Sequence, residues 1–316
     1  MRRIAVTGVS GYIGTLLARR LSAHPDVEAV VGVDTRSPRD PPPKLRFYMR
    51  DVTGPLHDLF VAERIDAAVH LAFVVRPRRQ ERDTQRINVE GTRNFLHACM
   101  EAAVPRIVYF GSAAAYGAHA DNPVPLTEEH PLRPNPGFRY AVDKAATDEM
   151  MQEYARAHTN ATVTILRGCP VLGPGGARAV GAKIFQPVMI KIAGRDPAVQ
   201  FVHEDDIAGI LTAVLERPAP GVYNVAGDGY LRYTQLARLA RRRMISLPQW
   251  GLAAAMSAGW TLRLQGQSPP AGLDFIAYPW VVANAKLKDA TGYRYQYSTQ
   301  DAVLAYLQSL RPQPPR

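Results

Sequence analysis

The segment from Thr7 to Gly14 constrains the fold of this chain more than any other. It reads Thr-Gly-Val-Ser-Gly-Tyr-Ile-Gly, follows the apolar run of residues 4–6, and precedes leucines with helical spacing in residues 15–21. That order predicts a strand, a tight glycine turn and a helix. Such a turn leaves backbone N–H groups free at the helix N-terminus, where a pyrophosphate can bind without obstruction by Cβ atoms. Because the spacing is G-x-x-G-x-x-G rather than the commoner G-x-G-x-x-G, the prediction needs support from the rest of the chain.

A carboxylate at the end of the next predicted strand gives that support. Residues 28–34 form a β-branched run that ends in Asp34, at about the 20-residue spacing from the turn that a dinucleotide-binding unit uses. A carboxylate there accepts hydrogen bonds from the ribose hydroxyls and repels a 2′-phosphate. Arg36 argues the other way, because an arginine can accommodate that phosphate. The balance favours NAD over NADP.

The remaining strands of the first half follow at regular intervals. Residues 66–72 form a nearly continuous apolar run, which is typical of a parallel strand covered on both faces. Helical spacing occupies about residues 80–103 and 140–157. The other predicted strands are residues 45–49, 106–110 and 162–166. Six strands that alternate with helices predict an α/β fold with a Rossmann-like, doubly wound parallel sheet.

The second half of the chain is less regular. Glycine and proline turns surround one predicted helix over residues 183–192, and residues 230–290 indicate short helices with loops. Residues 204–216 indicate a helix and residues 221–226 a strand. We therefore expect a smaller C-terminal substrate lobe. The expected division is an NAD(P)-binding Rossmann domain over 1–167, to which 204–228 return, a substrate lobe over 168–203 and 229–298, and a C-terminal helix and tail over 299–316.

Composition and charge exclude other classes of protein. Hydrophobic residues make up 47% of the 316 residues, as in globular proteins. The net charge of +10 comes from scattered arginines, and a positive field of this kind can steer an anionic cofactor or substrate. No known nucleic-acid-binding module is present, so we expect no nucleic-acid partner. The two cysteines, Cys99 and Cys169, are too few for a disulfide framework or a zinc site.

Targeting segments and metal sites are not expected either. The chain enters its first predicted strand directly, without a signal peptide, and no apolar run approaches the roughly 20 residues that span a bilayer. We therefore expect a cytoplasmic protein without a transmembrane segment. Residues 203–206, a histidine and three acids, suit the first turn of a helix better than a metal site. The apolar residues 250–264 are expected to form lobe core, with an apolar substrate pocket or a membrane contact as alternatives.

Tyr140 and Lys144 form the constellation with the clearest chemistry. They are four residues apart in a predicted helix and therefore share one face of it. An unperturbed tyrosine has a pKa of about 10 and is a poor base at neutral pH, but a neighbouring cation lowers that value. Ser112 follows the fifth predicted strand, at the edge of the sheet where ligands bind. Its hydroxyl can hold a substrate oxygen whose charge changes.

These residues belong to an ordered set that resembles a known family. Over most of its length the chain is similar to the extended short-chain dehydrogenase/reductases, the NAD-dependent epimerase/dehydratase family. The matching positions are the glycine turn, Asp34, residues 51–52, 70–72 and 88–92, Ser112 with residues 116–117, Tyr140 with Lys144, Arg167 with residues 173–174, and residues 201–203 with 205–206.

The resemblance implies hydride transfer between NAD and a substrate carbon. Tyr140 would exchange the proton of a substrate hydroxyl or carbonyl, and Ser112 would hold the same oxygen. Lys144 would lower the pKa of Tyr140 and bind the nicotinamide ribose. The cofactor itself carries the hydride.

The resemblance also implies a set of cofactor contacts. Asp51 and Val52 would lie beside the adenine, and Leu71 and Ala72 along the cofactor. Asn88 would support the site from its helix, although for Asn88 and His70 local backbone hydrogen bonding is an alternative role. The complete implied set is Thr7, Gly8, Ser10, Gly11, Tyr12, Ile13, Gly14, Asp34, Arg36, Asp51, Val52, Leu71, Ala72, Asn88, Tyr140 and Lys144.

Departures from the family pattern bear on the substrate. Dehydratase members place an acid pair directly after the serine, where this chain has Ala113 and Ala114, so elimination of water has no obvious general acid or base. Two positions that often grip a sugar-nucleotide diphosphate, an arginine and an asparagine, are Val199 and Pro170 here. The basic residues available as replacements are Arg178, Lys183 and Arg195.

Three functions therefore compete. The first is an NAD(P)-dependent oxidoreductase that acts on a secondary alcohol or ketone of a small-molecule substrate, with Tyr140 as acid/base. The second is a nucleotide-sugar epimerase that uses tightly bound NAD. The third is a non-catalytic cofactor-binding scaffold or redox sensor. Because relatives often dimerise through the two helices near 80–103 and 138–157, we expect a homodimer, with Ala145, Ala146 and Met150 on the exposed face.

Overall fold

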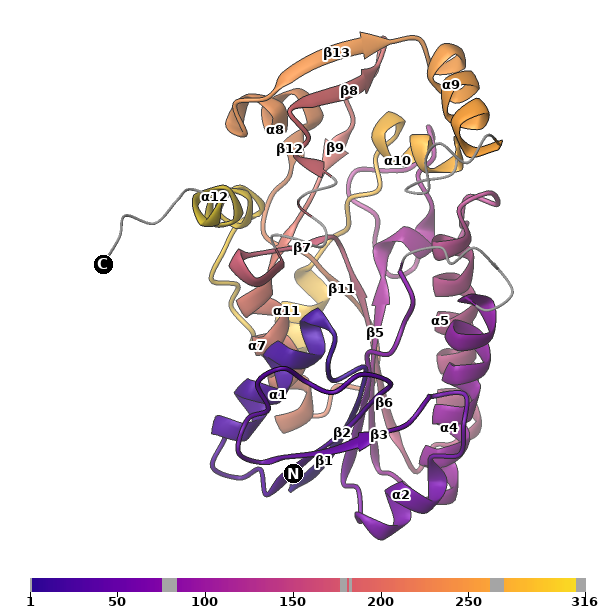
Figure 1. Ribbon diagram of the computed structural model, residues 1–316, viewed down its shortest axis with the longest axis vertical. Coiled ribbons are helices and arrows are strands. Elements are labelled where there is room, and N and C mark those ends of the chain that lie inside the picture. Colours follow the sequence, from indigo (N-terminus) through magenta and orange to yellow (C-terminus); the bar gives the residue numbers. More distant parts are fainter. Residues whose placement is uncertain (1, 76–83, 177–180, 182–183, 262–269, 311–316) are drawn as a thin grey trace.

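A seven-stranded parallel sheet forms the centre of the molecule, with strand order β11-β6-β5-β4-β1-β2-β3. The computed structural model describes residues 2–75, 84–176, 181, 184–261 and 270–310. The strands are β1 (Arg3–Thr7), β2 (Ala29–Asp34), β3 (Leu45–Met49), β4 (Ala67–His70), β5 (Arg106–Ser112), β6 (Thr162–Gly168) and β11 (Gly221–Val225). The prediction of a Rossmann-like parallel sheet is confirmed (Figure 1).

The strand order reverses between β1 and β4. From β1 the chain adds β2 and β3 on one side, and it then returns to add β4, β5, β6 and β11 on the other. All the strands point the same way, so their carboxyl ends lie along one edge of the sheet. In such sheets, ligands bind at that edge near the point of reversal.

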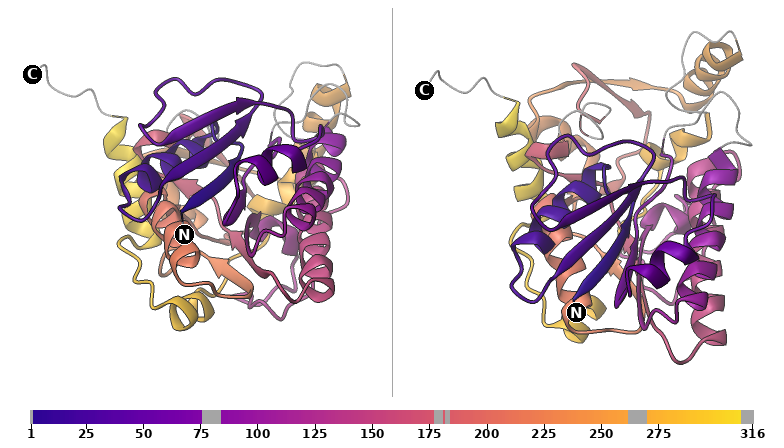
Figure 2. Two further views of the ribbon diagram at one scale, coloured as in Figure 1. Left: turned by 90° about the horizontal axis from the view of Figure 1, so that it is seen from below. Right: turned by 60° about the horizontal axis from the view of Figure 1, so that its bottom comes forward.

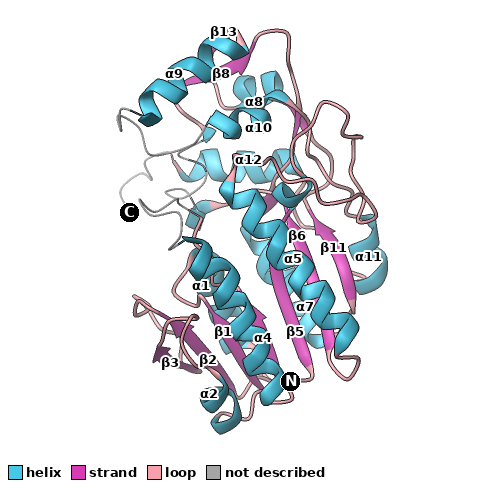
Figure 3. Cartoon of the chain, turned by 90° about the vertical axis from the view of Figure 1, so that its right-hand side faces the viewer, coloured by secondary structure: helices cyan, strands magenta, loops and turns pink. Residues whose placement is uncertain are grey.

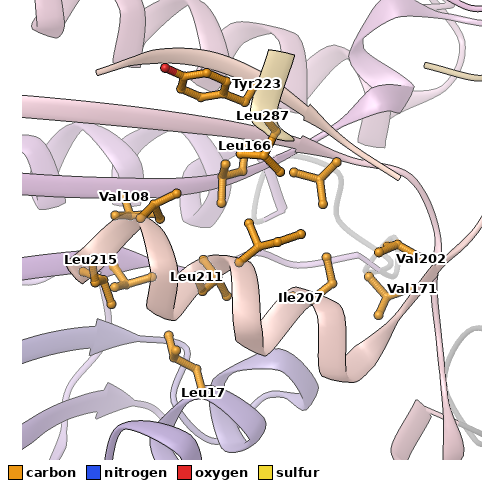
Figure 4. Close-up of a cluster of buried hydrophobic side chains, with 14 of the residues drawn as sticks. Leu17, Val108, Leu166, Val171, Val202, Ile207, Leu211, Leu215, Tyr223 and Leu287 are labelled. Carbon is orange, nitrogen blue, oxygen red and sulfur yellow. The ribbon is translucent and has the colours of Figure 1, made fainter. Parts of the chain in front are cut away.

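Helices cover both faces of the sheet (Figures 1 and 2). Side chains of β1 alternate between two cores: Ile4 and Val6 belong to one, and Ala5 belongs to the other. The first core is covered by α1 (Tyr12–Ala23), α7 (Glu204–Glu216) and α11 (Ala285–Thr291), and the second by α2 (His57–Ala62), α4 (Gly91–Glu101) and α5 (Arg139–Ala157). Figure 4 shows Ile207, Leu211 and Leu215 of α7 within the first core.

The remaining elements lie beyond the carboxyl edge of the sheet, at the top of Figure 1. Three pairs of short strands are β7 (Val171–Leu172) with β10 (Val202–His203), β9 (Ala198–Val199) with β12 (Leu231–Arg232), and β8 (Val188–Ile192) with β13 (Arg243–Leu247). The helices here are α8 (Tyr233–Leu239), α9 (Gln249–Thr261), α10 (Asp274–Ala277) and α12 (Thr299–Ser309). Among the described residues, no helix combines the length and apolar character that crossing a membrane requires.

Two helix predictions were wrong in detail. Residues 188–192, predicted as part of a helix over 183–192, form strand β8, which pairs with β13 in a region where only short helices were expected. The pairing buries Met189 and Ile192, and a short apolar run does not by itself distinguish a buried strand from a helix. The predicted helix over 80–103 contains a π-helical segment, Arg86–Glu90, before α4. Residues 80–83 and 182–183 of these predictions lie outside the described part of the chain.

Candidate active site

The glycine turn joins β1 to α1 at the point where the strand order reverses. Gly8 adopts φ +72°, and a Cβ atom on it would lie 2.7 Å from the backbone nitrogen of Ala72, which follows β4. A Cβ on Gly14 would overlap the carbonyl oxygen of Gly8. Only glycine tolerates such a close approach of backbone segments. Glycine at these two positions therefore lets the turn pack directly against itself and against the segment after β4.

Asp34 connects this turn to the end of β2. Its two carboxylate oxygens accept hydrogen bonds from the backbone N–H groups of Ser10 and Arg36, each at 3.1 Å, and the Ser10 hydroxyl donates to the carbonyl oxygen of Arg36 at 2.6 Å. Each carboxylate oxygen keeps a lone pair for a further donor, such as a ribose hydroxyl. The Arg36 side chain is exposed.

A buried chain of hydrogen bonds runs beneath the turn. The Thr92 hydroxyl donates to the carbonyl oxygen of Asn88 at 2.6 Å, so it accepts from Nε2 of His70 at 3.0 Å. His70 Nδ1 then accepts from the Thr7 hydroxyl at 2.8 Å. Burial, followed by the charge of Lys144, lowers the pKa of His70 to about 3. His70 is thus a neutral structural side chain, and the alternative of local backbone hydrogen bonding was wrong for it.

Asn88 links the loop after β4 to the helix that carries Tyr140. Its side-chain amide accepts from the Val74 N–H at 2.8 Å, donates to the Val74 carbonyl oxygen at 3.3 Å, and donates to a carboxylate oxygen of Asp143 at 3.0 Å. The Asn88 side chain is fully buried. Its partners lie far from it in the sequence, so its contacts are not limited to the local backbone.

The other predicted cofactor residues lie along the same edge of the sheet. Asp51 is exposed and accepts hydrogen bonds from Thr53, whereas Val52 is buried. Leu71 and Ala72 follow β4 and are half-buried. Asp51 lies two residues after the end of β3, and Leu71 lies directly after the end of β4.

Ser112, Tyr140 and Lys144 meet at the end of β5. The backbone N–H of Ala114 donates to Ser112 Oγ at 3.2 Å, and Ser112 lies close enough to Tyr140 for its hydroxyl to act on the pKa of that phenol. Lys144 Nζ donates to the Phe110 carbonyl oxygen at 3.0 Å. Tyr140 and Lys144 belong to the first turns of α5, which packs against β5 and β6.

Burial dominates the proton affinities of this trio. It raises the pKa of Tyr140, and the hydrogen bond from Ser112 only partly opposes the rise. It lowers the pKa of Lys144 to about 7, with the charge of Asp148 acting in the opposite direction. The expected lowering of the Tyr140 pKa by Lys144 is therefore not present in this structure, because the ammonium is itself desolvated and bonded to a backbone carbonyl.

A family model described as the NAD dependent epimerase/dehydratase family matches residues 4–226. The chain belongs to this family. An uncharacterized protein of Mycobacterium tuberculosis is 24% identical over 96% of this chain and 82% of its own length. The GDP-6-deoxy-D-mannose reductase of Pseudomonas aeruginosa is 25% identical, with 97% and 96% covered.

Solved structures show the same fold. The UDP-glucose 4-epimerase of Thermotoga maritima, solved with UDP-glucose, has a TM-score of 0.78 at 18% identity, over 97% of this chain and 98% of that one. The Bordetella bronchiseptica enzyme WbmG, solved with NAD, has a TM-score of 0.76 at 20% identity, over 97% and 93%. Membership of the family makes this chain an NAD-dependent enzyme of the short-chain dehydrogenase type.

The residues of the glycine turn fit the pyrophosphate of NAD. Glycine at positions 8 and 14 lets the backbone of the turn pack closely at the N-terminus of α1, where N–H groups and the helix dipole favour an anion. Asp34 fits a ribose with free hydroxyls. In this chain, the groups that would contact the pyrophosphate are largely backbone groups of the glycine turn.

A buried hydrogen-bond network joins Arg167, Asp148 and Tyr116, and the sequence analysis did not predict that these residues contact one another. Arg167 makes two hydrogen bonds to the carboxylate of Asp148, at 2.7 and 2.8 Å, and a third to the hydroxyl of Tyr116 at 2.8 Å. The network fixes α5 against β6. Asp148 follows Lys144 by four residues, as Lys144 follows Tyr140, so helical spacing could have placed all three on one face.

The positions that depart from the family pattern carry no cation in the structure. Val199 is half-buried against lobe core and Pro170 is half-buried, while Ala113 and Ala114 are buried. The guanidinium of Arg195 lies over the ring of Tyr278, 5.0 Å from its centroid. Arg178 and Lys183 lie outside the described residues.

The acidic residues at the start of α7 have structural partners. Glu204 accepts from the Tyr12 hydroxyl and from the Gly175 N–H, so it ties the glycine turn to the loop after β7. Asp206 accepts from the Tyr293 hydroxyl at 3.0 Å, and His203 Nδ1 accepts from the Asp205 N–H at 3.2 Å. Within the described ranges, no group of three or more His, Cys, Asp or Glu side chains could hold a metal ion.

Proposed function

We propose that this chain is an NAD-dependent oxidoreductase that interconverts a secondary alcohol and a ketone, with Tyr140 as acid/base. The observation that carries the proposal is the placement of Tyr140 beside Ser112 at the carboxyl end of β5, with Lys144 one helical turn further along α5. The absence of acids at Ala113 and Ala114 argues against dehydration.

The two hydroxyls divide the work at the substrate oxygen. Ser112 Oγ accepts from the Ala114 N–H, so its own proton remains to be donated to a substrate oxygen bound beside Tyr140. In alcohol oxidation the substrate hydroxyl gives its proton to Tyr140 Oη. Bound NAD supplies the hydride acceptor. Burial disfavours charge both on Tyr140 and on Lys144.

Replacement of the tyrosine hydroxyl tests this assignment. We expect Tyr140→Phe to abolish NADH formation, followed by nicotinamide absorbance, while NAD binding measured by calorimetry is kept. Tyr154→Phe is the matched control, because Tyr154 is half-buried on the same helix and stacks on His158. Turnover that survives in Tyr140→Phe would show that another residue moves the proton.

The epimerase alternative predicts different behaviour of the cofactor. An epimerase retains NAD through purification and shows no net change in nicotinamide absorbance, whereas the proposed oxidoreductase releases cofactor and changes absorbance with substrate. Thermal-shift measurements with UDP- and TDP-sugars, compared with hydroxy-ketones, separate the two. Stabilisation by a nucleotide sugar alone would overturn the oxidoreductase proposal.

We also propose that two copies associate through α4 and α5, which lie side by side in Figure 3. A groove of about 340 Å³ between these helices is lined by apolar side chains that include Leu96, Met100 and Met150. Ala145, expected on the exposed face, is buried instead. We expect Met100→Glu to convert a dimer into a monomer in light scattering; a mass that does not change would contradict this interface. That the protein is located in the cytoplasm stays a prediction, which cell fractionation would test.

A further inference from the structure

A row of aromatic side chains extends from Tyr140 into the substrate lobe. The ring of Tyr140 lies 5.7 Å from that of Phe73 and 6.0 Å from that of Phe138. Phe138 lies 4.9 Å from Phe275, and Phe275 lies 5.1 Å from Trp280. All five side chains are half-buried. The row brings together residues that lie more than 200 positions apart in the sequence.

Neighbouring contacts hold this row in place. The indole Nε1 of Trp280 donates to the carbonyl oxygen of Phe275 at 3.3 Å, and Lys144 Nζ lies 3.7 Å from the ring centroid of Phe73. Phe138 directly precedes α5. Because the indole N–H is already bonded, the four rings other than Tyr140 present ring faces and edges rather than free polar groups. Rings attract other rings in offset or edge-to-face contact, and pre-ordered rings lose little entropy on binding.

Charged side chains beside members of this row already have partners. Arg139, between Phe138 and Tyr140 in the sequence, pairs with Asp143 at 2.7 Å, and Asp274, next to Phe275, accepts from the Asn135 amide at 3.0 Å. Val199 and Pro170 stand where two diphosphate contacts are common in the family pattern. The described surroundings of Tyr140 therefore offer more to a flat apolar group than to a diphosphate.

We propose that the substrate is an aryl-bearing secondary alcohol or ketone, whose ring packs against Phe138 and Phe275 while its oxygen meets Ser112 and Tyr140. The proposal rests on the proposed function and names its substrate class. The ring is attached to the reacting carbon directly or through a short link, because Phe138 is adjacent to Tyr140. In oxidation, the carbon–hydrogen bond gives its hydride to NAD and the hydroxyl gives its proton to Tyr140, so the products are the ketone, NADH and one proton.

Binding to the Tyr140→Phe variant with NAD present tests the aromatic row without turnover. Acetophenone and its ring-saturated analogue, cyclohexyl methyl ketone, have the same carbon skeleton. We expect calorimetry to give roughly threefold to tenfold tighter binding of the aryl ketone. Introducing Phe275→Leu should remove most of that preference. Phe47→Leu is the matched control, because Phe47 is a half-buried phenylalanine of β3 outside the row.

The possible outcomes separate this inference from the proposed function. Equal binding of the two ketones, or a preference that persists in both Phe275→Leu and Phe138→Leu, overturns the aryl assignment even if the wild-type protein oxidises alcohols. An aryl preference that Phe275→Leu removes supports the assignment, and it stands even where NADH formation is absent and the proposed function fails. UDP-glucose that binds more tightly than both ketones overturns both.

Discussion

The sheet domain and the lobe beyond its carboxyl edge differ in what organises them. In the sheet domain, the backbone of one turn approaches the next strand so closely that Gly8 and Gly14 admit no side chain, and buried polar groups such as His70 and Arg167 are fully paired. The lobe contains short strand pairs and apolar clusters of its own, and the ring of Phe275 contacts Phe138 of the sheet domain. Backbone geometry of the first kind suits a cofactor common to a family, whereas side chains of the second kind can vary with the substrate.

Two arginines give the largest expected contrast between the regions. Arg167→Met leaves the buried carboxylate of Asp148 without its partner, and we expect a loss of roughly 3–5 kcal/mol in the free energy of unfolding. Arg195→Met in the lobe removes only a stacking contact with Tyr278, with an expected loss of about 1 kcal/mol or less. Urea unfolding measures both. Equal losses would remove this distinction between the two regions.

Two glycines with nearly the same backbone conformation give the next contrast. Gly8 has φ +72° and lies against the backbone of residues 71–72, whereas Gly194 in the lobe has φ +73° and no atom within 4 Å of the place that a Cβ would occupy. Gly194→Ala should cost about 1–2 kcal/mol from backbone strain alone. Gly8→Ala should cost roughly 3 kcal/mol, because overpacking is added to the strain.

Cofactor affinity sharpens the glycine comparison. Calorimetry should show weakened NAD binding for Gly8→Ala and unchanged binding for Gly194→Ala. A Gly8→Ala variant with the stability of Gly194→Ala and with normal NAD affinity would show that the turn has more room than the structure indicates.

Acidification should affect the two regions in opposite directions. The folded-state pKa of His70 is about 3, below its unfolded value of about 6.5, so the unfolded chain binds the extra proton between these values. Stability contributed at this site falls as the pH drops through that window, by about 1.4 kcal/mol per pH unit. Burial raises the pKa of Asp274 in the lobe, so the folded chain binds that proton first and stability at this site rises on acidification.

Variants isolate these two pH effects. His70→Gln should flatten the decline in unfolding free energy on acidification from pH 6.5 to pH 5. Asp274→Asn should make the decline in unfolding free energy steeper at lower pH. A His70→Gln profile parallel to that of the wild type would indicate that the imidazole is protonated in the folded chain.

Local patterns in the sequence were enough to predict the elements of the sheet domain. Apolar runs with glycine turns predicted the strands β1 to β6, and the position of Asp34 followed from the length of one strand–helix–strand unit. The spacing of Tyr140 and Lys144 put them on one helix face, where the structure has them. Such features depend on the 3.6-residue helical period and on the alternation of strands, which act over a few residues.

Contacts between distant segments were decided only by the tertiary structure. Strand β8 exists because it pairs with residues more than 50 positions later, and the aromatic row joins loops from opposite halves of the chain. The sequence by itself determined the family fold, the glycine turn that fits NAD, and the positions of Tyr140 and Lys144 on one face of a helix. The pKa shifts of those two groups, the pairing of Arg167 with Asp148 and the ring contacts beside Tyr140 were decided by the tertiary structure, because desolvation depends on what the whole chain packs around a site.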